Sequence, residues 1–103
     1  MGIKKAIIAA VFALASTGAM AQNFDDGVVA FIQGDSATAL KIWEPLANNG
    51  DKEAQYHLGY MFQTGTGVIK DNQKALFWYN KAAKNGHGKA FILAKVVERE
   101  MKH

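Results

Sequence analysis

The chain of 103 residues has no cysteine, one proline and two serines, and each shortage restricts the chemistry available to it. Without cysteine there can be no disulfide bridge, thiolate zinc site or thiol oxidoreductase centre. Packing alone must therefore hold the fold together. The serines, Ser16 and Ser36, form no Ser-His-Asp set that is evident from spacing, although spacing does not exclude convergence in space.

Histidines are also few, and His57, His87 and His103 lie far apart without a His-x-x-x-His pair. A metal site needs three or four converging ligands, and the sequence indicates none. We therefore expect no metal and no cofactor, and we expect the histidines to lie at the surface, with His57 as the exception to watch.

No apolar run is long enough to cross a membrane. The uncharged run at residues 6–16 is well short of the roughly 20 residues that a spanning helix needs. Two lysines precede it, and the small residues of Ala-Met-Ala at 19–21 follow it, as in a secretory signal peptide. We predict a signal at 1–21, cleavage before Gln22, and a periplasmic or secreted protein. The alternative is a membrane anchor.

An excess of charge is also missing. The formal net charge is +3, and two of the lysines lie in the predicted signal, which leaves +1 for residues 22–103. So small a balance is weak evidence for nucleic-acid binding, and we predict no nucleic-acid partner.

What the chain does have is an internal repeat with a spacing of 36 residues. A fixed period of this length indicates stacked supersecondary units. The large aromatic Trp43 recurs as Tyr79, and seven other residues recur unchanged: Asp35, Ala39, Leu40, Ala47, Asn49, Gly50 and Ala54 return as Asp71, Ala75, Leu76, Ala83, Asn85, Gly86 and Ala90.

Helical periodicity between the Gly and Asn breaks predicts five helices. The first, third and fifth helices are expected at about 24–33, 52–63 and 89–102. The second is expected to run from an N-cap at Ser36 to Asn49-Gly50, and the fourth from an N-cap at Asp71 or Asn72 to Asn85-Gly86. The apolar faces of the first four helices are expected to carry the following residues, in chain order: Val28, Phe31 and Ile32; Ala39, Leu40, Trp43 and Ala47; Ala54, Leu58, Met61 and Phe62; and Ala75, Trp78, Tyr79, Ala82 and Ala83.

Two residues oppose this helical pattern. Pro45 lies past the first turn of the second helix, where it should bend the helix or free a carbonyl. Gly59 lies in the middle of the third helix, where it costs about 1 kcal/mol relative to alanine. We expect that glycine to be needed because a neighbouring backbone comes close.

The signature residues of one known repeat are present in order at 54–62, 65–68, Asp71, Lys74-Ala75, Trp78-Tyr79, Lys81-Ala82-Ala83 and Gly86. They resemble a Sel-one-like repeat, a relative of the tetratricopeptide repeats. The resemblance implies an all-α fold, a short right-handed superhelix of about two helix hairpins plus a C-terminal capping helix. It places one full unit at 51–86 and partial units at 24–50 and 87–103.

The last predicted helix departs from that pattern. Lys95 stands where the family has glycine, and Glu98 stands where it has an aromatic residue. Both would obstruct a further stacked unit, so we interpret this helix as a polar-backed cap. Because only about two and a half units are present, an apolar end stays exposed, and self-association is a further possibility.

The resemblance also implies a groove for a partner, with Tyr56, His57, Tyr60 and Gln63 as candidate lining residues. Phe77 is a fifth candidate partner-binding residue, because the family usually has a polar residue at this position. It would form a contact patch if it lay beside exposed apolar residues of the last helix, such as Phe91, Ile92 or Val96.

The function that follows is an exported, non-catalytic module or scaffold that binds a peptide or helix of an envelope or secreted protein in this groove. The alternative is a small enzyme or ligand-binding protein acting on cell-wall or β-lactam compounds, by analogy with exported relatives. The paired cysteines of the β-lactam-linked branch are absent here, so that activity is not carried over.

Overall fold

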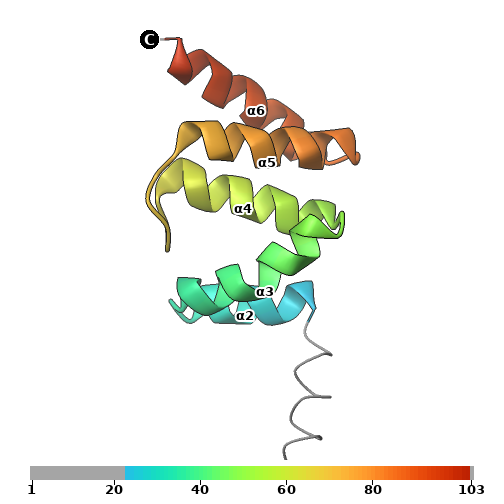
Figure 1. Ribbon diagram of the computed structural model, residues 1–103, viewed down its shortest axis with the longest axis vertical. Coiled ribbons are helices and arrows are strands. Elements are labelled where there is room, and N and C mark those ends of the chain that lie inside the picture. Colours follow the sequence, from blue (N-terminus) through green and yellow to red (C-terminus); the bar gives the residue numbers. More distant parts are fainter. Residues whose placement is uncertain (1–22, 103) are drawn as a thin grey trace, which may run out of the picture.

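The computed structural model describes residues 23–102, and in that part of the chain every element is a helix (Figure 1). The predicted signal at 1–21 lies outside the described residues. The helices are α2 (Phe24–Ile32), α3 (Ser36–Asn48), α4 (Lys52–Thr64), α5 (Asn72–Lys84) and α6 (Gly88–Met101). The expected all-α solenoid of two hairpins and a C-terminal helix is confirmed. None of the described helices is long and apolar enough to span a bilayer.

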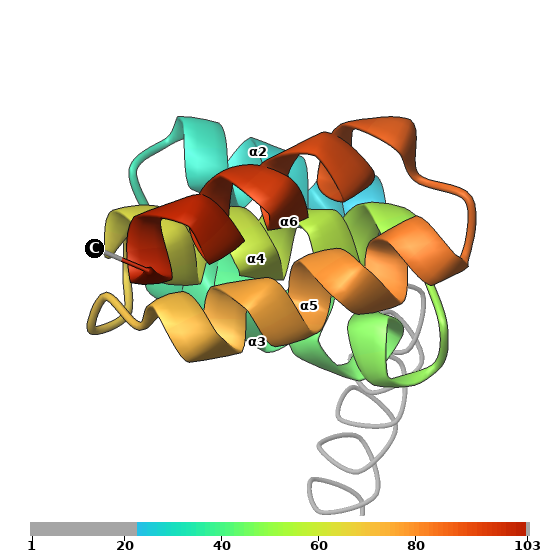
Figure 2. The ribbon, with the colours of Figure 1, turned by 90° about the horizontal axis from the view of Figure 1, so that it is seen from above.

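The helices stack in chain order. Each packs against the next one, and α6 also touches α4. The stack has α2 at one end and α6 at the other (Figure 1). Seen from above, α3 and α5 lie on one side, while α2, α4 and α6 lie toward the other (Figure 2). The molecule therefore presents one face built from alternate helices.

Aspartate side chains begin the three central helices. Asp35, Asp51 and Asp71 cap α3, α4 and α5 by accepting hydrogen bonds from backbone N–H groups of the first turn. The expectation that Ser36 caps α3 was wrong. The Asp35 carboxylate accepts from both the backbone N–H and the hydroxyl of Thr38, at 3.1 and 2.7 Å, and these bonds hold the pKa of Asp35 below its ordinary value.

One fully buried aromatic residue anchors each hairpin. Trp43 stacks on Phe24 with ring centroids 5.6 Å apart, and its indole N–H donates to the Phe24 carbonyl at 3.0 Å. Tyr79 donates from its hydroxyl to Oε1 of Gln63 at 2.6 Å, and burial raises the pKa of Tyr79. Both polar atoms thus have partners inside the core, as burial requires.

A glycine faces each of these aromatic rings. A Cβ at Gly59 would lie 2.5 Å from Cδ1 of Tyr79, and a Cβ at Gly27 would overlap the Trp43 ring. We expected a neighbouring backbone to approach Gly59, and that expectation was wrong, because the close atoms belong to a side chain. In each hairpin a glycine on the first helix makes room for the ring of the second.

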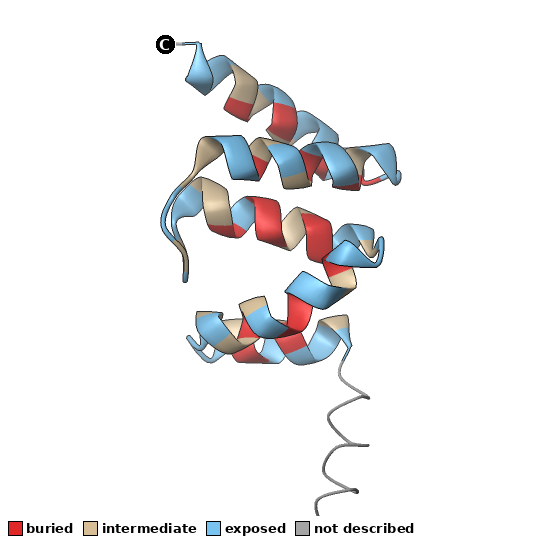
Figure 3. Ribbon diagram, viewed as in Figure 1, coloured by how far each residue is buried: buried red, intermediate tan, exposed pale blue. Residues whose placement is uncertain are grey.

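Some residues expected in the core are exposed or only partly buried. Buried residues follow the inner side of each helix (Figure 3). Ile32, expected in the core, is 77% exposed, because it lies at the end of α2, which packs mainly on α3. Phe62 and Trp78 are only partly buried at the edges of the two clusters. His87, expected at the surface, is buried.

Candidate functional site

Two adjoining hollows lie on the side of the stack formed by α2, α4 and α6. The first, of about 260 Å³, lies between α2 and α4, and its walls are mostly apolar. The second, of about 660 Å³, is more open and lies between the N-terminal ends of α4 and α6. Tyr56 and His57 line both hollows, so these two side chains form a ridge between them. The apolar hollow also takes in Val28, Phe31, Trp43 and Tyr60, and the polar one Lys52, Glu53, Gly86, His87, Gly88 and Lys89.

Tyr56 is held on the ridge by aromatic contacts from two other helices. Its ring stacks on the His87 ring with centroids 4.3 Å apart and planes 14° from parallel, and it approaches Tyr79 at 5.9 Å. Stacked aromatic pairs add stabilisation beyond the area they bury. The position of Tyr56 therefore depends on α5 and α6 as well as on its own helix.

The partly buried ring of His57 contacts aromatic rings of α2 and α3. Its ring lies 4.7 Å from Trp43 and 5.0 Å from Phe24, centroid to centroid. Nδ1 lies 2.9 Å from the Glu53 carbonyl oxygen, which can only accept, so Nδ1 carries the proton and donates. Burial lowers the pKa of His57 below its ordinary value, so the ring is neutral at pH 7.

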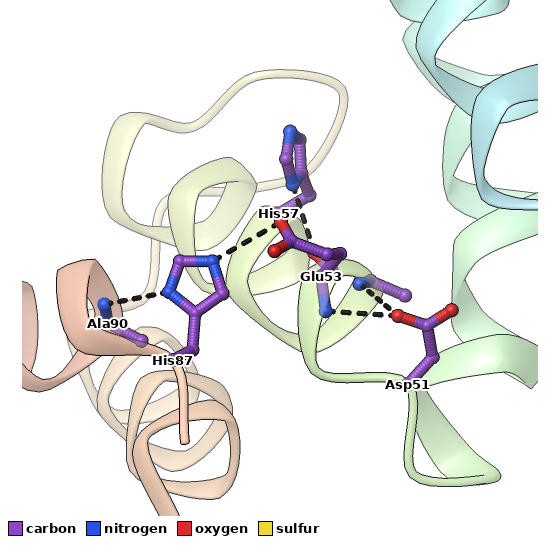
Figure 4. A network of polar contacts seen from close by, with 6 residues as sticks. Asp51, Glu53, His57, His87 and Ala90 are labelled. Atoms are coloured by element: carbon purple, nitrogen blue, oxygen red, sulfur yellow. Dashed lines mark hydrogen bonds and ion pairs between the residues drawn. The ribbon is translucent and has the colours of Figure 1, made fainter. Parts of the chain in front are cut away.

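His87 joins the N-terminal ends of α6 and α4 (Figure 4). Its Nδ1 accepts from the backbone N–H of Ala90 at 3.2 Å, which makes His87 the N-cap of α6. Because Nδ1 accepts, the proton is on Nε2, which donates to Oε2 of Glu53 at 3.2 Å. One buried imidazole thus fixes where α6 begins and ties it to the helix that carries the ridge.

The structure separates the five residues predicted to bind a partner. Tyr56, His57 and Tyr60 lie together around the apolar hollow. Gln63 accepts the Tyr79 hydrogen bond and lines neither of these hollows. Phe77 is half-exposed on α5, where its ring contacts are with Trp78 and the ammonium group of Lys81, at 5.1 and 4.9 Å.

The patch predicted for Phe77 with Phe91, Ile92 or Val96 stays a prediction, because ring contacts alone do not decide it. Among the ring contacts of residues 23–102, none joins Phe77 to Phe91. Phe91 instead lies under the Lys95 ammonium group, with the nitrogen 5.6 Å from its ring centroid.

Glu53 and His87 are the site residues that the sequence did not reveal. The usual N-cap residues are Ser, Thr, Asp and Asn, so a histidine before a predicted helix was not interpreted as a cap. Its partner Glu53 is 34 positions away, and a helix pattern carries no information about so distant a contact. The available signal was weak: His87 stands three residues before the apolar Ala90, the spacing of a cap to its N–H donor.

Within the part of the chain that the structure describes, no three His, Asp or Glu residues come together as metal ligands. Nδ1 of His57 donates to a backbone carbonyl, so the unprotonated nitrogen of the neutral ring is Nε2.

We expect stability to depend on pH through His57. Its pKa is lowered in the folded chain, so below about pH 6.5 the unfolded chain binds the proton more readily and stability falls as the pH falls. Stability from this group is fully present above that pH. Urea unfolding at about pH 7.5 and 5.5 measures the loss, and His57→Phe should reduce the difference between the two conditions. An equal pH dependence in both proteins would contradict this account.

Comparison with known proteins places the ridge inside a recognised repeat. Residues 52–87 match the Sel1 repeat family, a segment that begins with α4 and ends at His87. Chitin synthase regulatory factor 4 of Schizosaccharomyces pombe is 34% identical over 79 residues. This match covers 77% of the present chain, which spans 11% of that relative's length. No solved structure matches the chain significantly.

Proposed function

Because residues 52–87 match a Sel1 repeat and helices on both sides continue its packing, we propose that this chain is an exported, non-catalytic module that binds a peptide or helix of another protein. Sel1 repeats generally mediate protein–protein interaction. The name of the yeast relative describes a regulatory factor and so also supports a non-catalytic role. The lysines, apolar run and Ala-Met-Ala of residues 1–21 support export, and export would bring the chain to a partner in the envelope or outside the cell.

The apolar hollow between α2 and α4 is the observation that carries the proposal. Tyr60 stands at its edge with 41% of its surface exposed, and its ring lies 6.5 Å from Phe31, centroid to centroid. Aromatic residues that a partner covers beside an apolar pocket often contribute most of the binding energy of an interface. The hollow is large enough for one apolar side chain of a partner, and the polar hollow beyond the Tyr56–His57 ridge can receive the next part of its chain.

Selection of a displayed peptide library on the purified chain tests this proposal. We expect Tyr60→Ala to weaken the selected peptides at least about tenfold, because loss of a hot-spot aromatic residue costs about 2 kcal/mol or more. Phe77→Ala is the matched control: it removes another half-exposed aromatic residue, from α5, and should leave affinity unchanged. If Phe77→Ala weakened binding and Tyr60→Ala did not, the partner would bind on α5 and the proposed groove would be wrong.

A further inference from the structure

The outer surface of α2, at one end of the stack, carries an acidic and apolar stripe. Asp25, Val29 and Ile32 are all exposed, and their spacing of four and three residues places them on one side of the helix. Val29 is 53% and Ile32 is 77% exposed. The helix contains two aspartates and no basic residue. An apolar surface with negative charge at the N-terminal end of the helix is thus left without a neighbour among residues 23–102.

The outer surface of α6, at the opposite end of the stack, carries an apolar and basic stripe. Ile92, Lys95 and Arg99 are exposed and share one side of the helix, with Phe91 next to them. Here the apolar residues come first along the helix and the cations follow, so the expectation of a wholly polar outer side on this last helix was wrong. Glu98 lies beside the stripe and already faces the Lys95 ammonium group at 3.9 Å.

The two stripes are complementary when their helices run antiparallel. Asp25 and Ile32 are seven residues apart, as are Ile92 and Arg99, so both pairs span about 10 Å at 1.5 Å per residue. In that alignment Ile32 meets Ile92 and Asp25 meets Arg99. Between them, Val29 meets the methylene stem of Lys95. Antiparallel packing is also how successive helices of this chain meet (Figure 1).

We propose that α6 of one copy packs antiparallel on α2 of another copy, with Ile32 against Ile92 and Asp25 against Arg99. The two surfaces are different and lie at opposite ends of the stack, so the contact is heterologous and leaves a free end on each side. Copies then add head to tail, with each new contact burying apolar ends that a single copy exposes. The groove on the α2–α4–α6 side takes no part in this proposal.

The contact is expected to be weak. It joins one helix face to another, which is less than the roughly 800 Å² per partner of a standard stable interface. The purified chain should therefore be monomeric when dilute and form dimers and longer species as concentration rises. Because association follows mass action, sedimentation velocity over about a hundredfold range of concentration measures the rise of the dimer and of longer species. A chain that stays monomeric throughout the range overturns the proposal.

Two single variants test whether the contact is heterologous. Ile32→Glu blocks the α2 surface and Ile92→Glu blocks the α6 surface, so each protein alone should self-associate at least about tenfold more weakly. Each retains one intact surface, and the surfaces are of opposite kinds. An equimolar mixture should therefore form a 1:1 dimer with the affinity of the unmodified chain and no longer species. A mixture that remains monomeric, or a single variant that associates normally, overturns the proposal.

Charge exchange tests the antiparallel alignment. Asp25→Lys and Arg99→Glu should each weaken association, and the double variant should recover most of the loss because each contact again joins opposite charges. No recovery would contradict the pairing. Phe77→Glu is the control for general loss of exposed apolar surface, since Phe77 lies on α5 and belongs to neither stripe. Its association should be unchanged, and circular dichroism verifies that every variant is folded.

Discussion

Substitution of leucine for Gly59 is expected to lower the free energy of unfolding by about 3 kcal/mol or more, the upper part of the range for overpacking a core. A Cβ at this position would already lie 2.5 Å from Cδ1 of Tyr79. Tyr79 cannot move aside easily, because its ring is fully buried and its hydroxyl is bonded to Gln63. The leucine must therefore separate α4 from α5.

Alanine substitutions at two helical glycines provide the comparison. In a helix interior alanine is favoured over glycine by about 1 kcal/mol, so propensity alone predicts a gain at Gly59. We expect Gly59→Ala to destabilise instead, because the Tyr79 ring occupies the space. At Gly88 in α6 a Cβ would meet no heavy atom within 4 Å, so Gly88→Ala should be neutral or slightly stabilising. Urea unfolding measures all three variants, and an unchanged stability of Gly59→Leu would refute the close-packing account.

The position of Gly59 could be predicted from the sequence, but its partner could not. A glycine in a helix interior signals that something comes close, and the pattern does not say whether it is backbone or side chain. The matching pair, Gly27 and Trp43, was missed for a related reason. The two aromatic residues are 36 positions apart, whereas the two glycines are 32 apart, because the loop of the first hairpin is four residues shorter. A fixed period of 36 residues therefore aligns α3 with α5, the second helices of the two hairpins, but shifts α2 by four residues relative to α4.

Local periodicity explains which parts of the candidate site were predictable. Tyr56 and Tyr60 are one turn apart, so their common face follows from helix geometry. The ridge also depends on His87, the N-cap of α6, which stacks on Tyr56 and bonds to Glu53 at the start of α4. Such a contact depends on where α6 docks, and no residue pattern within either helix reports it. Gln63 was placed in the groove for the same reason: its bond to Tyr79 crosses to another helix.

Replacement of Trp43 by alanine is expected to have the largest effect of any substitution considered. Truncation of a buried tryptophan costs about 3–5 kcal/mol, and loss of its hydrogen bond to Phe24 adds about 1 kcal/mol. A domain of this size has about 4–12 kcal/mol of stability in total. The variant should therefore lose most of its resistance to urea.

The loss should also be concentrated in α2, because Trp43 contacts Phe24 and Phe31 there and fills the space opposite Gly27. In Trp43→Ala, the amide hydrogens of α2 should exchange faster than those of the α4–α5 hairpin, whose Tyr79 core is intact. Trp78→Ala is the matched control, because Trp78 is only partly buried and its removal should cost less. Trp43 also lines the apolar hollow, so the variant should lose peptide binding together with α2. Uniform exchange across all five helices would show instead that the two hairpins unfold as one unit.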